Sequence, residues 1–168
     1  MAPDIRRISA AETRDLRQAI LRPHQRPEEL VFPGDEDPDS LHVGAFSGGK
    51  LIGVASIMRS VMSGRASCEA WQLRGMAIRP EHRRRGSGAA LVRACIDYAA
   101  REGGQVLWCR ARTPAVPFYR ALGFETEGEE FEIPVSGPHY VMWRRVSPSA
   151  SQGMEPRQPS SRNTEREE

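Results

Sequence analysis

The chain has 168 residues, enough for one domain with a hydrophobic core, and 39% of them are hydrophobic. Its 24 basic and 22 acidic residues leave a formal net charge of +2, which argues against a general nucleic-acid binder. The apolar runs fall far short of the roughly 20 residues that span a bilayer, so we expect a cytoplasmic protein without a membrane partner.

The N-terminal part predicts a strand over residues 5–8 and a helix over 10–21. Ser9 is placed to cap this helix, with Glu12 three residues further on in the capping-box pattern. Residues 22–40 are rich in Pro, Asp and Glu and predict a long loop with a short helical turn near 28–31. A loop of this length in a small domain usually has a function or is mobile.

A hairpin follows, with strands over 41–46 and 51–58 and a turn over 47–50. The polar segment 59–66 joins this hairpin to a strand over 68–78. That strand includes Gly75, which predicts a bulge or a close approach of the backbone to another group.

The most informative segment is the basic, glycine-containing turn at residues 83–90, which directly precedes a predicted helix over 88–101. Gly86 and Gly88 allow turn conformations that other residues avoid. The first N–H groups of a helix have no acceptor inside it, and the helix dipole favours an anion there. The turn therefore predicts a phosphate site, although an arginine run is by itself more often a solvated surface.

The spacing Arg83-x-x-Gly86-x-Gly88 resembles the pyrophosphate-binding signature of the GNAT superfamily of acetyl-CoA-dependent N-acetyltransferases. A second segment strengthens the resemblance, because residues 118–124 match the family's Phe-Tyr-x-x-x-Gly-Phe element. Pro114 suits a helix start before this element, and Gly123 suits the helix end. The predicted strand over 105–109 separates the two motifs.

The last predicted elements are an antiparallel pair of strands over 124–133 and 139–146. The resulting order of elements is that of an α/β protein, and the resemblance implies a GNAT fold with a mixed, mostly antiparallel sheet of about six to seven strands flanked by helices. We expect residues 1–146 to form this domain. Residues 147–168 are almost devoid of apolar side chains and predict a disordered tail.

The resemblance implies that acetyl-CoA is bound as the acetyl donor. The implied contacts come from the strand before the turn, from the turn itself, and from the position where many family members carry an asparagine, here an arginine. These residues are Met76, Ala77, Ile78, Arg83, Arg84, Arg85, Gly86, Ser87, Gly88, Ala89 and Arg110. The arginine at position 110 departs from the family pattern and leaves that one contact in doubt.

The resemblance also implies that Tyr119 protonates the departing coenzyme thiolate. Its alternative role is that of a core aromatic. Our candidate for accepting the amine proton is Glu69, which precedes Trp71 on the predicted strand, and a surface glutamate is the alternative. Glu129 and Glu130 are weaker candidates. His139 and Tyr140 are further pocket candidates without a defined role.

The cysteines and histidines show neither a disulfide framework nor metal-ligand spacing, so we expect mostly buried, reduced thiols and no metal. They are Cys68, Cys95, Cys109, His24, His42, His82 and His139.

The amine acceptor, a small molecule or a peptide, is not identified by the family's motifs. Acidic residues at 28, 29, 35, 36, 37 and 39 could attract a cationic amine or could be solvated loop charges. A catalytically inactive acyl-CoA-binding regulatory module remains the alternative to an enzyme, and a nucleic-acid-binding arginine run is disfavoured by the balanced charge. Homodimers are frequent in the family, and no segment identifies an interface.

Overall fold

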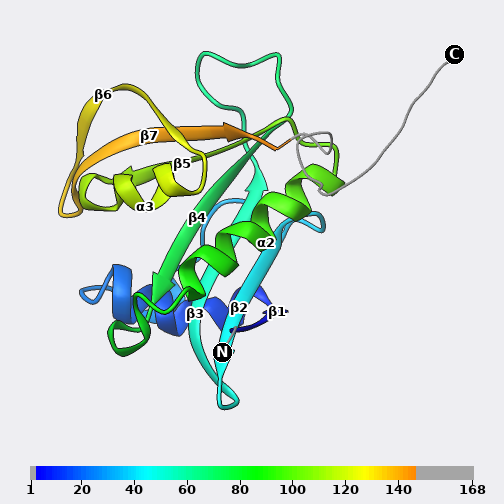
Figure 1. Ribbon diagram of the computed structural model, residues 1–168. Helices are drawn as coiled ribbons and strands as arrows, with labels where there is room; N and C mark the ends of the chain where they lie inside the picture. The colour runs from blue at the N-terminus through cyan, green and yellow to red at the C-terminus, as the bar shows by residue number, and fades with distance from the viewer. Residues whose placement is uncertain (1–2, 147–168) are drawn as a thin grey trace, which may run out of the picture.

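The computed structural model describes residues 3–146, and these residues form a seven-stranded sheet with helices on its faces (Figure 1). The strands lie in the order β1-β2-β3-β4-β5-β7-β6, and only the β4–β5 pair is parallel. Their bounds are β1 Asp4–Arg7, β2 Leu41–Ser47, β3 Lys50–Arg59, β4 Ala70–Ile78, β5 Val106–Arg112, β6 Glu125–Ile133 and β7 Gly137–Arg145. The predicted α/β fold with a mixed, mostly antiparallel sheet is confirmed, whereas the predicted tail at 147–168 lies outside the described residues.

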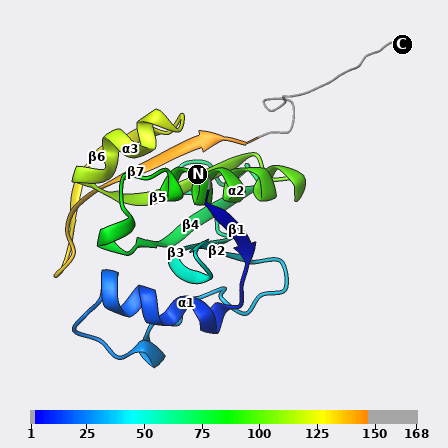
Figure 2. The same ribbon diagram turned by 60° about the horizontal axis from the view of Figure 1, so that its bottom comes forward.

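Two longer helices cover opposite faces of the sheet (Figure 2). Helix α1 (Ala10–Leu16) continues as the π-helical turn η1 (Arg17–Leu21). The predicted helix over 10–21 is therefore confirmed, and its last five residues are π-helical. Helix α2 (Ser87–Arg101) lies on the other face, on the same side as the short α3 (Val116–Ala121). Single 3₁₀ turns complete the structure at η2 Pro27–Glu29, η3 Pro80–His82 and η4 Thr113–Ala115.

The start of α1 has the predicted capping box. The Glu12 backbone N–H donates to Ser9 Oγ at 3.2 Å, and the Ser9 backbone N–H donates to the Glu12 carboxylate at 2.8 Å. Because both donors lie outside the hydrogen-bond ladder of the helix, the box satisfies two groups that would otherwise be unpaired.

The main core lies between α2 and the sheet. Leu91, Cys95 and Ala99 point from α2 toward the sheet and are fully buried. Trp71 of β4 meets the edge of Tyr98 of α2 at 5.8 Å between ring centroids. Each large apolar side chain buried here contributes about 1.5–3 kcal/mol to stability, which fixes α2 against β3 and β4.

Strand β4 contains the predicted bulge at Gly75. Val54 of β3 pairs with Ala77, and Ser56 pairs with Arg74, so β4 carries one extra residue in this interval. Gly75 has a φ of +64°, a conformation that favours glycine. The extra residue reverses the alternation of side chains, and both Leu73 and Met76 therefore pack toward the α2 side of the sheet.

A buried ionic network ties the long loop after α1 to the sheet. The Arg17 guanidinium is fully buried and donates to both carboxylate oxygens of Asp35, at 2.7 and 3.0 Å. It also donates to the Leu30 carbonyl and to Ser56 Oγ, at 2.9 and 3.0 Å, and it lies 3.9 Å from the centroid of the Phe32 ring. Arg17 thereby holds three points of the loop against β3.

We predict that Asp35→Asn destabilises the fold by about 3–5 kcal/mol, because it leaves the Arg17 charge buried without its partner. Asp37→Asn, at an exposed position two residues away, is the control and should cost less than about 0.5 kcal/mol. Urea unfolding measures the stability of both variants: the midpoint urea concentration should shift, and the dependence of the unfolding free energy on urea concentration should stay constant. Equal midpoints for the two variants would contradict a structural role of the ion pair.

The same pair predicts a loss of stability in acid. Burial of the Asp35 carboxyl opposes its ionisation, but the hydrogen bonds from Arg17 and from the Phe32 backbone N–H outweigh burial and lower its pKa. Because the folded pKa lies below the unfolded value of about 3.9, this stabilisation is complete above about pH 4 and is lost as the pH falls through the folded pKa. The acid-dependent loss should be smaller in Asp35→Asn than in the wild type.

Candidate functional site

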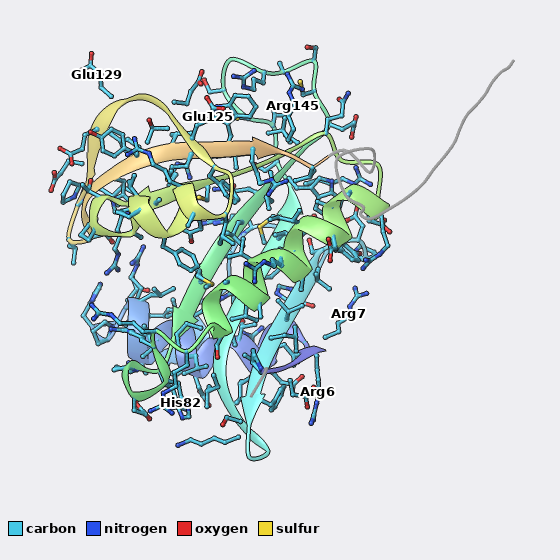
Figure 3. All side chains as sticks on the ribbon, viewed as in Figure 1. Arg6, Arg7, His82, Glu125, Glu129 and Arg145 are labelled. Carbon is cyan, nitrogen blue, oxygen red and sulfur yellow. The ribbon has the colours of Figure 1, made fainter. Side chains whose placement is uncertain are left out.

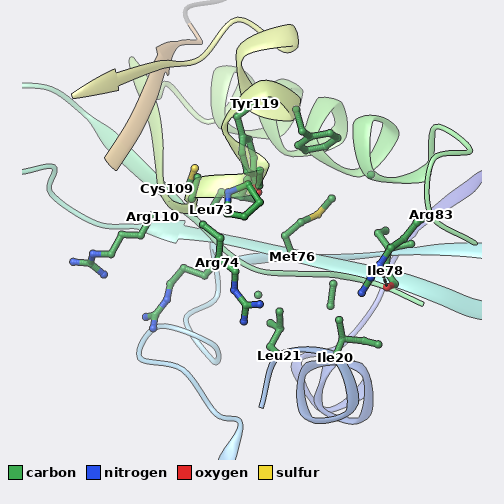
Figure 4. Close-up of a pocket in the computed structure, with 18 of the residues that line it drawn as sticks. Ile20, Leu21, Leu73, Arg74, Met76, Ile78, Arg83, Cys109, Arg110 and Tyr119 are labelled. Carbon is green, nitrogen blue, oxygen red and sulfur yellow. Dashed lines mark hydrogen bonds between the residues drawn. The ribbon is translucent and has the colours of Figure 1, made fainter. Parts of the chain in front are cut away.

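Strands β4 and β5 separate partway along their length and open a pocket between them. Their parallel pairing comprises Ala70 with Val106, Trp71 with Leu107 and Gln72 with Trp108, and it ends there. A cavity of about 970 Å³ lies beyond that point (Figure 4). The facing edges of both strands keep unpaired backbone N–H and C=O groups in this cavity, so an extended ligand could bond to them as an added strand does.

Most of the predicted coenzyme residues line this one pocket, which contains residues from β4, from the turn before α2, from β5 and from α3. The predicted residues in the lining are Met76, Ala77, Ile78, Arg83, Arg84, Gly86, Gly88, Ala89, Arg110 and Tyr119. Two predicted coenzyme residues are not in the lining: Arg85 is exposed, and Ser87 is buried.

The turn before α2 presents backbone donors to one end of the pocket. Gly86 is the N-cap residue with a φ of +86°, and Arg84 also has a positive φ of +63°. Gly86 has no side chain that could cap the helix, so the first N–H groups of α2 remain available to an anion. The side chain of Arg83 extends beside this turn and donates from Nε to the Ile78 carbonyl at 3.2 Å.

Gly88 allows β4 and α3 to approach the start of α2. A Cβ atom at this position would lie 3.0 Å from Met76 Cε and 3.3 Å from Phe118 Cζ. The second glycine of the signature thus has a packing role in this chain, while Gly86 supplies the turn conformation.

Tyr119 reaches the pocket from α3. Its ring packs edge-on against Phe118 and Phe124, with centroids 4.9 and 5.4 Å away. Within residues 3–146 its hydroxyl makes no hydrogen bond. Burial, with a further contribution from Cys109, raises the pKa of Tyr119 well above its usual value, so the phenol is protonated at neutral pH.

Cys109 also lines the pocket, but its environment does not favour a nucleophile. Burial raises the pKa of the Cys109 thiol to about 12, and burial has the same effect on Cys95. Both side chains stay in the unreactive thiol form at neutral pH. Cys68 is free as well, which agrees with the expected reduced cysteines. The described residues also contain no cluster of His, Cys, Asp or Glu suited to a metal ion.

The structure does not bring Glu69 to this pocket. Glu69 lies just before β4, at the end where β4 and β5 are still paired, and its carboxylate binds the exposed Arg59 at 3.2 Å. Glu130 accepts a hydrogen bond from Thr113 at 2.6 Å, and Figure 3 shows Glu129 pointing outward from β6. None of these carboxylates is in the pocket lining.

His139 of β7 is a pocket residue to which the sequence assigned no role. Its side chain is buried, and Nδ1 lies 2.8 Å from the Gly137 carbonyl oxygen. A carbonyl only accepts, so Nδ1 carries a hydrogen, and Nε2 is then the ring atom that can accept a proton. The pocket therefore contains a proton donor, Tyr119, and a proton acceptor, His139.

The acidic residues of the loop do not form a wall of the pocket. Asp35 is bound to Arg17, Asp39 to Arg59, and Glu36 to Arg14. From this loop the pocket lining includes Phe32 and Arg22, and it includes no Asp or Glu from any described element. Of the two alternatives for these carboxylates, charges of the loop itself fit this arrangement better than a surface that attracts a cationic acceptor.

No helix within residues 3–146 combines the length and the apolar character needed to cross a membrane.

Comparisons with known proteins agree with this geometry. The model of the acetyltransferase (GNAT) family matches residues 4–124. The chain is 34% identical over 146 residues to the uncharacterized N-acetyltransferase YitI of Bacillus subtilis, an alignment that covers 87% of this chain and 98% of that protein.

Solved structures share the fold at lower identity. Escherichia coli ElaA superposes with a TM-score of 0.68 at 18% identity, covering 85% of this chain and 99% of that chain. An aminoglycoside 6'-N-acetyltransferase complexed with coenzyme A superposes with a TM-score of 0.62 at 16% identity, covering 86% of this chain and 98% of that chain.

We predict that Gly75→Ala lowers stability by about 1–3 kcal/mol more than Gly48→Ala. Both glycines have positive φ, at +64° and +57°, so the backbone strain is similar. A Cβ at Gly75 would lie 3.0 Å from both Arg17 Nε and Phe32 Cε2, whereas a Cβ at Gly48 meets nothing within 4 Å. Thermal unfolding of both variants measures the difference, and equal losses would show that the bulge tolerates a side chain.

Proposed function

We propose, because the chain belongs to the acetyltransferase (GNAT) family, that it moves an acetyl group from acetyl-CoA directly to a primary amine. The observation that carries this proposal is the opening between β4 and β5, which has free helix N–H groups at one end and the Tyr119 hydroxyl beside it. The shared fold of the aminoglycoside acetyltransferase that is complexed with coenzyme A supports the choice of donor.

The pocket residues fit the chemical groups of coenzyme A. The N–H groups after Gly86 and the Arg83 and Arg84 side chains would hold the pyrophosphate. The edge of β4 that faces away from β3, over residues 76–78, would bond the extended amide-containing arm, as an added strand would. Bound acetyl-CoA would supply an activated acetyl thioester. A backbone N–H of this edge would stabilise the charge that develops on the carbonyl oxygen during transfer.

Two side chains would handle the protons of the reaction. The amine nitrogen forms its bond to the acetyl carbon as the carbon–sulfur bond breaks. His139 Nε2 would accept the proton that the amine loses, and the Tyr119 hydroxyl would donate a proton to the departing sulfur. Exchange with solvent then restores both residues. Glu69 has no part in this proposal because it lies outside the pocket.

A catalytically inactive acyl-CoA-binding module is the alternative function. Such a module would keep the turn and the open strand edge, but it would not need a protonated Tyr119 facing the pocket. An amine panel that follows thiol release from acetyl-CoA separates the two: turnover of any amine supports the enzyme, and coenzyme binding without turnover supports the module.

Replacement of the turn glycine tests the coenzyme site. We predict that Gly86→Glu weakens coenzyme A binding by more than about tenfold, because it adds a negative charge beside the pyrophosphate donors. Gly128→Glu is the matched control, since Gly128 has a similar φ, +76° against +86°, and both positions have open space around the Cβ. Calorimetric titration with coenzyme A measures both variants. Equal coenzyme A affinities of the two variants would show that the turn is not part of the coenzyme site.

Removal of the Tyr119 hydroxyl tests the proton donor. We predict that Tyr119→Phe lowers kcat by about 100-fold or more and leaves the coenzyme Kd nearly unchanged. Tyr140→Phe is the control, because Tyr140 packs against the core and is not in the pocket lining. Steady-state rates of thiol release provide the measurement. A kcat for Tyr119→Phe within twofold of the Tyr140→Phe value would rule out proton donation by this residue.

A further inference from the structure

We propose that the amine acceptor also carries an anionic oxygen group, a carboxylate or a phosphate, and that Arg74 and Arg110 bind this group. The inference rests on the proposed acetyl transfer and narrows its substrate class. It follows from where β4 and β5 place the two guanidinium groups, from the charges around them, and from the side of the sheet on which they lie.

The two arginines occupy equivalent positions on the separating strands. The last β4–β5 pair is Gln72 with Trp108, and Arg74 and Arg110 each lie two residues further along. Side chains two residues apart share a face of a strand, so both arginines project on the face that carries Trp108. The contacts agree, because the Arg110 guanidinium carbon lies 5.2 Å from the Trp108 ring centroid and that of Arg74 lies 4.5 Å from the Phe32 ring centroid.

This face is opposite to the one that carries the coenzyme residues. Leu73 and Cys109, the neighbours of the two arginines, pack into the core under α2 and α3 together with Tyr119. Beyond the bulge, Met76 packs on that side as well. The arginines therefore reach the pocket from the α1 side, and the opening between the strands connects the two sides.

The charged side chains that line this end of the pocket are all arginines. Its lining includes Arg22, Arg74, Arg110 and Arg112 and contains no Asp or Glu. Within residues 3–146 none of these four arginines has an acidic partner within 4.0 Å, although six other arginines do. Asp35, the acidic residue whose charge acts on Arg74, is bound to Arg17.

The positive charges of Arg110 and Arg17 disfavour the charged form of Arg74 when no anion is present. Burial lowers the pKa of Arg74, and the charges of Arg110 and Arg17 lower it further. The guanidinium group of Arg74 lies over the ring of Phe32, and that of Arg110 lies over the ring of Trp108. This stacking leaves the N–H edges of both groups free to bond. A carboxylate or phosphate accepts hydrogen bonds from guanidinium N–H edges and offsets this repulsion.

The acceptor is a better source of this anion than coenzyme A. Figure 4 shows Arg83, beside the α2 turn, on the far side of Met76 from Arg74 and Arg110. The α2 turn already provides the helix N–H groups and two arginines for the coenzyme phosphates. An anion on the amine, in contrast, would enter from the α1 side, where Ile20, Leu21 and Phe32 form the apolar part of the lining.

Matched amines that differ in this one group test the proposal. The pairs are β-alanine with β-alaninamide, glycylglycine with glycylglycinamide, and phosphoethanolamine with ethanolamine. We expect the wild type to prefer the anionic member by about 10- to 100-fold in kcat/KM, the effect of a charge-assisted hydrogen-bond pair. A preference in the carboxylate pairs alone assigns a carboxylate, and one in the last pair alone assigns a phosphate.

Arginine variants test the residues. Arg74→Gln and Arg110→Gln should each raise KM for the anionic amine about tenfold or more and should leave the coenzyme A Kd unchanged. Arg110 is exposed, so its variant should fold even if the half-buried Arg74 position does not tolerate the change. Arg93→Gln, at an exposed site on α2, is the control and should change neither constant.

Three outcomes would overturn the inference. The first is equal kcat/KM within every pair of amines. The second is a loss of coenzyme A affinity in both arginine variants with an unchanged KM for the amine, which would assign the arginines to the coenzyme. The third applies if no amine is turned over: the proposed acetyl transfer then fails, and the anion site is tested by calorimetry with β-alanine and phosphoethanolamine. Absence of binding, or binding that both arginine variants retain, would exclude the site.

Discussion

The separation of β4 from β5 is the feature on which the pocket depends, and the bulge at Gly75 accompanies it. With the ladder to β5 ending at Gln72, the free edge of β4 is available to a ligand while its other edge stays bonded to β3. The bulge then reverses which side chains face α2. Arg74, before the bulge, and Met76, after it, consequently lie on opposite sides of the sheet, so one strand lines the pocket from both sides.

The buried Arg17 network has a second consequence for the pocket. By binding Asp35, Arg17 fixes the loop that carries Phe32, and Phe32 in turn supports the guanidinium of Arg74. The same ion pair withdraws a carboxylate from the acceptor side. A single buried pair thus holds Phe32 beside Arg74 and, in the proposed anion site, leaves arginines as the only charged side chains from residues 3–146 that line this side of the pocket.

Local patterns in the sequence predicted the parts of the site that are made by local structure. The turn before α2 and the position of Tyr119 depend on short runs of residues, and both reach the pocket. The sequence places Glu69 just before Trp71 on a strand expected to face the acceptor, but β4 is still paired with β5 at that end, and the Glu69 carboxylate binds the exposed Arg59 instead. Arg74 and the role of His139 depend on which strands pair and in which register, which sets the face of each side chain; Gly75 predicts the bulge, but neighbouring residues do not predict these pairings.

Hydrogen exchange of backbone amides on addition of acetyl-CoA tests the central claim most directly, because it reports on the N–H groups that the open strand edge and the helix start leave unpaired. The account predicts slower exchange at residues 76–78 and 86–89 and little change in β1, β2 and β6. Protection confined to β6 and β7, or no protection at saturating acetyl-CoA, would contradict a donor site between β4 and β5.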